Sequence, residues 1–243
     1  MTLLEKLLSM DFDKKVATGL IMSGKVLIND VPTIIGSTKI KPSDNIRIKT
    51  NKEWVSRGAY KLLHAIDYFN IEIKDKVCLD VGSSTGGFTQ VLLAKNAQKV
   101  YALDVGTNQL DFQIRTNPKV ISLENTNLKN INKSMFNESI DFLCCDVSFI
   151  SCKNLFDILN KENILNKDNL LVILIKPQFE AKYELVSQGG FVDLKYHKEI
   201  IDNIIDYAQK IKFSFLGFIE SPIKGNKSQN IEYLALFRKE KYE

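Results

Sequence analysis

Two ionisable residues each follow a short apolar run, a placement that is typical of a catalytic site. Asp146 follows the run 142–145, and Lys176 follows the run 170–175. The carboxyl ends of parallel strands lie together at the sheet edge where ligands bind, so the carboxylate and the ammonium should converge there. A positioned lysine and carboxylate can remove or share the proton of an alcohol, which attacks poorly while protonated. Alternatively, a lysine that ends a strand simply carries its charge out of the core.

A second cation and a second anion can complete this site. Lys61 lies in a predicted helix before the first of these strands, and Glu232 interrupts the apolar run 231–237. Glu232 can pair with one of the lysines, because a buried carboxylate needs a partner. A lone glutamate in an edge strand can instead face water. The pattern predicts four convergent charges, on Lys61, Asp146, Lys176 and Glu232.

A glycine-containing loop with the sequence DVGSSTGGFT joins an apolar run to a predicted helix at 80–89. A triphosphate-binding loop needs a lysine after its last glycine, and Phe88 occupies that position. The dinucleotide fingerprint needs two glycines separated by one residue, whereas three residues separate Gly82 from Gly86. Asp80 would repel a phosphate, but its charge suits the cationic methionyl group of S-adenosylmethionine. The two glycines would let the backbone approach that ligand.

A second acid supports the same cofactor. Asp104 closes the next apolar run, where an acid can accept both hydrogen bonds of a ribose diol. Residues 124–127 follow the third run and would supply polar groups at the adenine edge. A plain turn between strand and helix explains the glycines alone, but not the two acids as well. The predicted S-adenosylmethionine site comprises Asp80, Gly82, Ser83, Gly86, Gly87, Phe88, Asp104, Asn127 and Asp146.

Apolar runs without alternation, separated by helix-like stretches, predict the fold from Trp54 onward. Strands that are covered on both faces carry such continuous runs. The last two runs, 213–219 and 231–237, are joined by a region too short for a helix, so they should pair antiparallel. We predict an α/β fold of the Rossmann-like methyltransferase type, a doubly wound and mostly parallel sheet with a terminal antiparallel hairpin. The expected strands before the hairpin are 77–81, 100–103, 120–123, 142–145 and 170–175.

The first fifty residues have a different pattern and predict a small α+β module. Apolar residues have helical spacing at 3–8, and a second helix-like stretch covers 14–22. Short strands joined by turns should follow, at 26–28, 34–35 and 46–48. We therefore divide the chain into a small module at 1–50, a linker at 51–60 and a catalytic domain at 61–243.

The net charge of +4 arises from the N-terminal part of the chain. Residues 1–60 contain ten Lys and Arg and six Asp and Glu, whereas residues 61–243 contain 23 of each class. A basic module beside a neutral domain suggests that the module holds a polyanion near a reaction site. A solvated basic surface without a partner is the alternative. The candidate RNA-binding residues are Lys14, Lys15, Lys25, Arg57, Lys224 and Lys227.

Length and composition exclude several other classes. A chain of 243 residues that is 44% apolar can bury one substantial core with a small appendage. No apolar run is long enough to span a membrane and no signal peptide is evident, so we expect a cytosolic protein without a membrane partner. We predict reduced core thiols and no metal site, because no Cys-x-x-Cys spacing occurs among Cys78, Cys144, Cys145 and Cys152.

Several sequence blocks follow one another in a fixed order through nearly the whole chain, at 55–62, 80–88, 100–106, 146–151, 176–181, 189–190, 221–225 and 230–233. Together they resemble the hemolysin A (TlyA) family of ribosomal RNA cytidine 2′-O-methyltransferases, whose catalytic domain is related to that of FtsJ-type RNA ribose methyltransferases. Residues 17–29 and the 44–46 segment resemble a small RNA-binding module that occurs in a ribosomal small-subunit protein and in pseudouridine synthases.

The resemblance implies an enzyme that uses S-adenosylmethionine and acts on ribosomal RNA or ribosomal subunits. It implies a Lys-Asp-Lys-Glu tetrad on the four charges named above, with Lys176 as the central base or alkoxide stabiliser. The chain departs from the family's pattern in three places. It lacks an Arg-Leu pair before the first helix and an arginine after Gly190, and its loop after Lys224 is one residue longer.

Three other functions can be compared with this prediction. A cytosine-carbon methyltransferase would need a nucleophile such as Cys145, which lacks the usual preceding proline or threonine. An amine methyltransferase would need a proline-rich aromatic motif where the chain has residues 146–149. A non-catalytic RNA-binding or ribosome-assembly protein would have no reason to keep Asp80, Asp104 and four convergent charges. A membrane-lytic protein would need a span or a long amphipathic helix.

Overall fold

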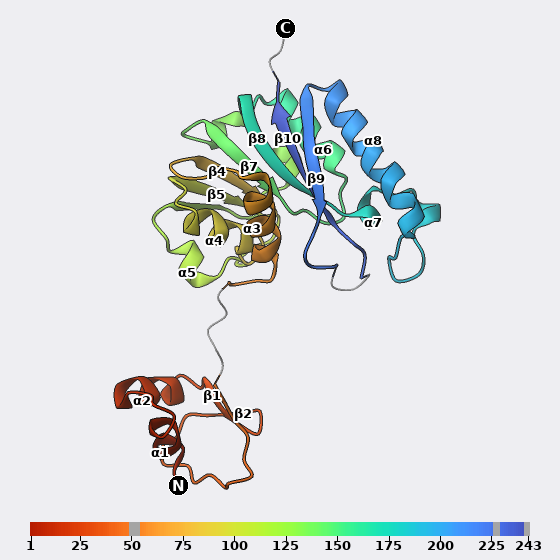
Figure 1. The fold of residues 1–243 in the computed structure, drawn as a ribbon. Coiled ribbons are helices and arrows are strands. Elements are labelled where there is room, and N and C mark those ends of the chain that lie inside the picture. The colour runs from red at the N-terminus through yellow and green to blue at the C-terminus, as the bar shows by residue number, and fades with distance from the viewer. Residues whose placement is uncertain (49–53, 226–228, 241–243) are drawn as a thin grey trace. The chain divides into compact units, whose positions relative to one another are not determined.

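A computed structural model of the chain describes residues 1–48, 54–225 and 229–240 (Figure 1). The chain divides into two compact units, Met1–Glu53 and Trp54–Glu243. The linker expected at 51–60 therefore does not extend through residues 54–60, and residues 51–53 lie outside the described ranges. The Val55 amide donates a hydrogen bond of 2.7 Å to the Gln90 side chain, which fastens this segment to the second unit.

The first unit contains two helices and a small antiparallel sheet with the strand order β2-β1-β3. Its elements are α1 (Leu3–Leu8), α2 (Lys14–Met22), β1 (Val26–Ile28), β2 (Val31–Thr33) and β3 (Ile46–Ile48). Leu7, Ile21 and Val26 contribute to one apolar core that joins the helices to the sheet. The prediction of a strand at 34–35 is wrong. The partner of β1 is β2, and their pairing ends at Thr33 because β1 has only three residues.

The second unit is built on a seven-stranded sheet with the order β6-β5-β4-β7-β8-β10-β9. Its strands are β4 (Val77–Val81), β5 (Lys99–Leu103), β6 (Val120–Leu123), β7 (Ile140–Cys145), β8 (Leu165–Ile175), β9 (Phe213–Glu220) and β10 (Tyr233–Lys239). The first five strands are parallel, and β10 runs antiparallel to both β8 and β9. The predicted doubly wound sheet with a terminal hairpin is therefore confirmed.

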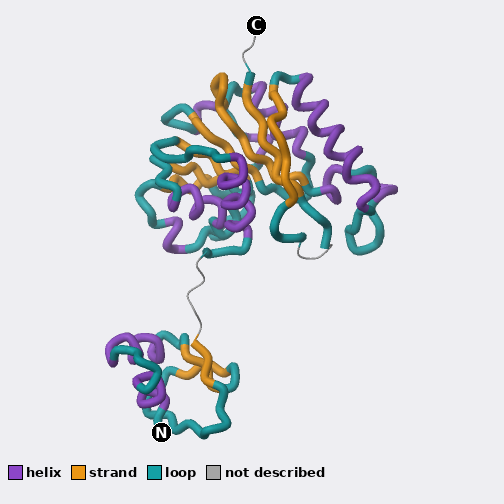
Figure 2. Tube along the Cα trace, viewed as in Figure 1, coloured by secondary structure: helices purple, strands orange, loops and turns teal. Residues whose placement is uncertain are grey.

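Helices cover both faces of this sheet (Figure 2). They are α3 (Gly58–Phe69), α4 (Gly87–Ala94), α5 (Phe112–Arg115), α6 (Cys152–Lys161), α7 (Pro177–Glu180) and α8 (His197–Lys210). Leu79 points into the core that contains α6 and α8, whereas its neighbour Cys78 points into the core that contains α3 and α4. Burial on both faces explains why the parallel strands are apolar without alternation.

The strand order reverses at β4, and this reversal positions the site. From β4 the chain proceeds outward through β5 and β6, and it then returns to place β7 on the other side of β4. Loops that leave two neighbouring strands in opposite directions open a crevice at their carboxyl ends, where ligands bind in this class of fold. Gly82 follows β4 and Asp146 follows β7 at this crevice.

The side chain of Phe156 provides a test of the core. Its ring is fully buried, with centroids 5.1 Å from Phe213 and 5.0 Å from Phe237. Phe156→Ala leaves a cavity between α6 and the sheet, and we expect a loss of about 3–5 kcal/mol in unfolding free energy. The fluorescence of Trp54, the chain's single tryptophan, reports unfolding of the second unit in urea. Phe112→Ala, at a ring that is 77% exposed, is the control, and an unchanged midpoint for Phe156→Ala would contradict this account of the core.

Candidate active site

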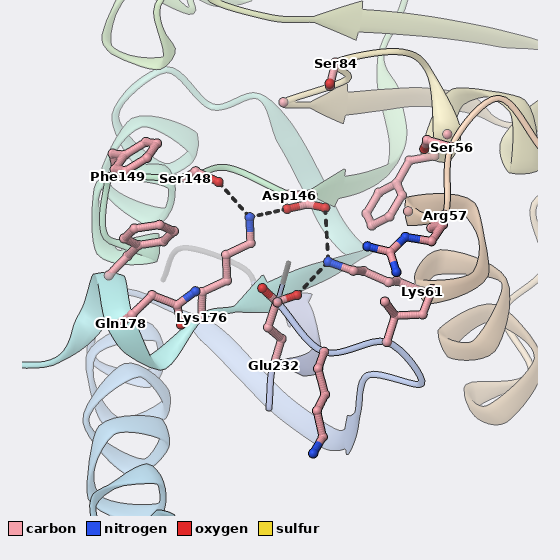
Figure 3. Close-up of a pocket in the computed structure, with 18 of the residues that line it drawn as sticks. Ser56, Arg57, Lys61, Ser84, Asp146, Ser148, Phe149, Lys176, Gln178 and Glu232 are labelled. Atoms are coloured by element: carbon pink, nitrogen blue, oxygen red, sulfur yellow. Dashed lines mark hydrogen bonds and ion pairs between the residues drawn. The ribbon is translucent and has the colours of Figure 1, made fainter. Parts of the chain in front are cut away.

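Four charged side chains form a continuous chain of ion pairs at the crevice (Figure 3). Lys176 Nζ lies 2.5 Å from one Asp146 carboxylate oxygen, and Lys61 Nζ lies 3.8 Å from the other. Lys61 Nζ also lies 2.6 Å from Glu232 Oε2. The sequence predicted that these four residues converge, and the structure brings them together with alternating signs and no net charge.

The register of the sheet explains why Lys176 and Glu232 lie at the same end of neighbouring strands. Tyr233 of β10 pairs with Ile175 of β8 in an antiparallel ladder, so Glu232 and Lys176 occupy the next opposed positions. The alternative that Glu232 lies in an edge strand and faces water does not hold, because Glu232 is buried, precedes β10, and β9 forms the edge. Glu232 is only 3% exposed and Lys176 7%. Both charges are therefore largely removed from water and depend on their partners.

Lys176 has a further partner that sequence reasoning missed. Its Nζ donates a hydrogen bond of 2.9 Å to Ser148 Oγ, in the segment that follows Asp146. A lysine ammonium has three N–H donors. One is directed at Asp146 and one at Ser148, and the third has no hydrogen-bond partner among the described residues, so it can donate to a ligand in the cleft. The polar character of Ser148, two residues after a candidate catalytic acid, was the available signal.

Two aromatic rings lie beside Lys176. The Phe149 and Phe179 ring centroids are 4.9 Å apart, and Lys176 Nζ lies 5.9 Å from the Phe179 centroid. Phe149 has a φ of 65°, which is unusual for a bulky residue, and is 89% exposed. Strained backbone and an exposed ring both cost free energy, and such features cluster at functional sites. Sequence reasoning did not assign a role to either phenylalanine.

The four charges line a cleft of about 630 Å³ on the second unit. Arg57 and Lys224, two of the candidate RNA-binding residues, also line it. Lys14 and Lys15 are exposed at the start of α2 in the first unit, and Lys25 is half-buried there. Lys227 lies outside the described residues. The cleft thus combines aromatic surface with cationic side chains, the composition that holds an unpaired nucleotide.

A second cavity of about 810 Å³ adjoins the first. The two share Gly82, Ser84, Asp146, Ser148 and Phe149. Asp104 and Asn127 line the second cavity alone, with apolar side chains that include Leu103 and Leu128. One Asp104 oxygen accepts the Ser84 amide at 2.8 Å and the other accepts the Gly106 amide at 2.7 Å. Asn127 also caps a short helix, since its side chain accepts the Lys129 amide at 3.0 Å.

The glycines of the 82–87 loop have different structural roles. Gly82 has a φ of 83°, and a Cβ there would lie 2.6 Å from the Asp146 carbonyl oxygen, so a glycine is required where the cavities meet. A Cβ at Gly86 would press against Leu110 and Ile114. Gly86 lines neither cavity and packs against the α5 region, and its expected contact with the cofactor stays a prediction. Ser83, Gly87 and Phe88 line the cleft of the four charges and not the second cavity.

Asp80 lies beneath this loop, and its expected role toward the cofactor stays a prediction. It is fully buried within β4 and lines neither cavity, so its carboxylate does not face the ligand space. Thr89 Oγ1 donates a hydrogen bond of 2.7 Å to it, which ties the strand to α4 beneath the loop. Burial raises the pKa of Asp80 to about 7. Asp80 therefore supports the loop from below, and its position within an apolar strand was the signal in the sequence for such a role.

Cys145 does not have the environment of a catalytic thiol. It is buried in β7, and burial raises its pKa far above the usual range. A reactive cysteine needs an accessible thiolate.

Among the described residues, no helix is long and apolar enough to cross a membrane.

Comparison with known proteins defines the class. Residues 54–239 match the family described as FtsJ-like methyltransferase. Hemolysin A of Brachyspira hyodysenteriae is 45% identical over 223 residues, which cover 91% of this chain and 92% of that protein. The 16S/23S rRNA (cytidine-2′-O)-methyltransferase TlyA of Mycobacterium tuberculosis is 36% identical over 225 residues, or 91% of this chain and 83% of that protein.

A solved structure agrees with these matches. A protein of Lactococcus lactis named as a hemolysin is 43% identical and superposes with a TM-score of 0.74, covering 78% of this chain and 90% of that chain. The second unit is thus a methyltransferase domain of the FtsJ-like class. Within that class, the chain belongs to the hemolysin A (TlyA) family.

The second cavity fits S-adenosylmethionine on two observations. Within the described part of the chain, each Asp104 oxygen accepts a single hydrogen bond, from a backbone amide, and keeps lone pairs for a ribose diol. Gly82 leaves backbone uncovered at the boundary with the cleft. In the adjoining cleft, the Ser83 hydroxyl is buried without a hydrogen-bond partner among the described residues, so a polar ligand group there would satisfy it.

The raised pKa of Asp80 predicts a pH dependence of stability. Between pH 4 and pH 7 the folded protein keeps a proton on Asp80 that the unfolded chain has lost, so the unfolding free energy falls as the pH rises. A pKa difference of this size between the folded and unfolded states corresponds to about 4 kcal/mol. Asp80→Asn keeps the shape of the side chain and removes this titration.

Urea unfolding followed by Trp54 fluorescence from pH 4 to pH 8 measures this effect. We expect the stability of the parent protein, relative to that of Asp80→Asn, to decline across this range. A constant difference between the two proteins would show that Asp80 is ionised in the folded state throughout.

Proposed function

We propose that this protein transfers the methyl group of S-adenosylmethionine to the 2′-hydroxyl of a cytidine in ribosomal RNA. The observation that carries the proposal is the ion-paired chain of Lys176, Asp146, Lys61 and Glu232 where the two cavities meet. An amine or a thiolate attacks a methyl donor with little assistance, whereas a ribose hydroxyl must lose its proton. The name of the Mycobacterium tuberculosis relative, a 16S/23S rRNA (cytidine-2′-O)-methyltransferase, supports both the cytidine and the ribosomal RNA as the acceptor.

The residues of the second cavity would hold the cofactor. Asp104 would accept hydrogen bonds from its ribose, and Asn127 and Leu128 would lie near its adenine. When bound, S-adenosylmethionine supplies the transferable methyl group and a positive charge beside the four charged residues. Gly82 lies close to the backbone of Asp146, and this close approach would hold the bound cofactor in a fixed position relative to the acceptor cleft.

Lys176 acts as the general base that removes the proton of the acceptor hydroxyl. In its neutral form its amine accepts that proton, and the resulting ammonium donates to Asp146 and Ser148 as the structure has it. Lys61 binds the other oxygen of Asp146 and is balanced by Glu232. This arrangement holds the Asp146 carboxylate between two cations, so it orients the lysine and stays in place during the transfer.

The cleft contains aromatic and cationic side chains that could bind an RNA substrate. Phe149 and Phe179 offer ring surface to an unstacked base, and Arg57 and Lys224 offer charge to phosphates. We further propose that the N-terminal module, residues 1–50, binds ribosomal RNA through Lys14, Lys15 and Lys25, and that ribosomal subunits are the substrate particles. The ribosome is cytosolic, so the proposal includes a cytosolic location.

The direct test is incubation of the protein with labelled S-adenosylmethionine and unmethylated ribosomal subunits. Nuclease digestion and mass spectrometry then identify the methylated nucleotide. We expect 2′-O-methylcytidine, and a methyl group on a base, or no incorporation, would contradict the proposal.

Lys176→Met tests the role of the central lysine in the same assay. Loss of a positioned acid-base group lowers rates by about 10²- to 10⁴-fold, and we expect a loss of this size in single-turnover rate. Calorimetric affinity for S-adenosylmethionine should stay within about threefold, since Lys176 does not line the cofactor cavity. Lys95→Met, at an exposed ion pair with Asp67, is the control and should retain the parental rate. A parental rate for Lys176→Met would remove the lysine from the mechanism.

Cys145→Ala separates this mechanism from a thiol-based attack on a base carbon. The side chain is buried in β7 and its pKa is raised by burial, so we expect methyl transfer within about threefold of the parental rate. Abolition of transfer with intact cofactor affinity would favour the thiol mechanism instead.

A further inference from the structure

Asn230 makes an unusual set of hydrogen bonds next to the cleft. Its side chain is 1% exposed, and its Nδ2 donates to the Gly190 carbonyl at 2.8 Å and to Gln178 Oε1 at 3.1 Å. Its Oδ1 accepts the Val192 amide at 2.9 Å, and its backbone carbonyl accepts the Gly225 amide at 3.0 Å. Both donors of the amide and its acceptor oxygen are therefore engaged.

These bonds connect two walls of the cleft that are distant in sequence. Gln178 and Gly190 belong to the segment that follows Lys176, whereas Gly225 and Glu232 belong to the segment that leads into β10. All four residues line the cleft, and Asn230 does not. Asn230 lies behind the cleft and joins the wall that carries Lys176 to the wall that carries Glu232.

We propose that Asn230 is a positioning residue that sets the width of the acceptor cleft and the placement of Glu232 on Lys61. The inference rests on the proposed function, because it concerns the binding of the RNA acceptor. Catalytic groups lose rate steeply when their spacing changes by about 1 Å. Without the amide, the segment around Gly190 and the segment before Glu232 lose their shared anchor. The cofactor cavity should be unaffected, because it shares no residue with these bonds.

The chemistry of an amide explains why this position needs asparagine. A single planar group must donate to two carbonyl-type oxygens and accept from one N–H. The substitution Asn230→Asp keeps the shape of the side chain but puts acceptors where two donors are needed. Gln178 can reverse its own amide to donate, whereas the Gly190 carbonyl cannot. Asn230→Asp would therefore place two acceptors in contact in a buried site.

Steady-state methylation of ribosomal subunits and calorimetric binding of S-adenosylmethionine test this proposal together. For Asn230→Asp and Asn230→Ala we expect kcat/KM for the RNA to fall about 10- to 100-fold. The Kd for S-adenosylmethionine should stay within about twofold. Gln178→Ala removes one of the anchored groups from the other wall and should lower kcat/KM in the same direction. Combined with Asn230→Ala it should add less than its separate effect, since both disrupt one connection.

Asn169→Ala provides the matched control. Asn169 also donates its side-chain amide to a backbone carbonyl, that of Ile140, but at the opposite end of the sheet. This variant should lose stability while keeping the parental kinetic constants. The proposal is overturned if the Asn230 variants keep the parental kcat/KM, or if their cofactor affinity falls in proportion to their activity. An inactive parent protein would refute the proposed function itself, whereas an active parent with unaffected variants refutes only the role of Asn230.

Discussion

The position of Asp146 between two lysines is the interaction on which the rest of the site depends. Its carboxylate contacts Lys176 and Lys61, and its backbone carbonyl lies where a side chain at position 82 would be. Removing one member of a buried ion pair leaves an unpaired charge, which costs several kcal/mol. The four charges therefore stabilise one another only as a complete set. Asp146 can hold them because it emerges beside β4, at the reversal of strand order.

The sequence predicted the parts of the structure that depend on local pattern and on strand ends. Continuous apolar runs identified the parallel strands, and the short connection between the last two runs identified the hairpin. Lys176 and Asp146 were recognisable because each ends a run, and the ends of parallel strands must converge. The pairing of Lys61 with Glu232 could be suggested only from their opposite charges, since the two residues are 171 positions apart in the sequence.

The sequence did not predict features that depend on what surrounds a residue in space. Asp80 has the charge expected of a cofactor ligand, but its side chain lies inside β4 and faces Thr89 beneath the loop. Gly86 permits a tight turn, yet the position of its missing side chain faces the α5 region and not the cavity. A glycine pattern shows that backbone must approach something closely, and it cannot show whether that neighbour is a ligand or another part of the protein.

The two cavities meet through residues that come mainly from the ends of β4 and β7, and this geometry separates two tasks. Asp104 and Asn127 line the second cavity and not the cleft, whereas Lys61, Lys176 and Glu232 line the cleft and not the second cavity. Under the proposed function, the loops beyond β8 and before β10 could therefore adapt to the shape of an RNA substrate without disturbing the second cavity. This freedom has a limit, because Lys176 begins one of those loops and Glu232 ends the other. These loops can vary only where Lys176 and Glu232 keep their positions. The buried side-chain amide of Asn230 helps to keep them there, because it hydrogen-bonds the loop that follows Lys176.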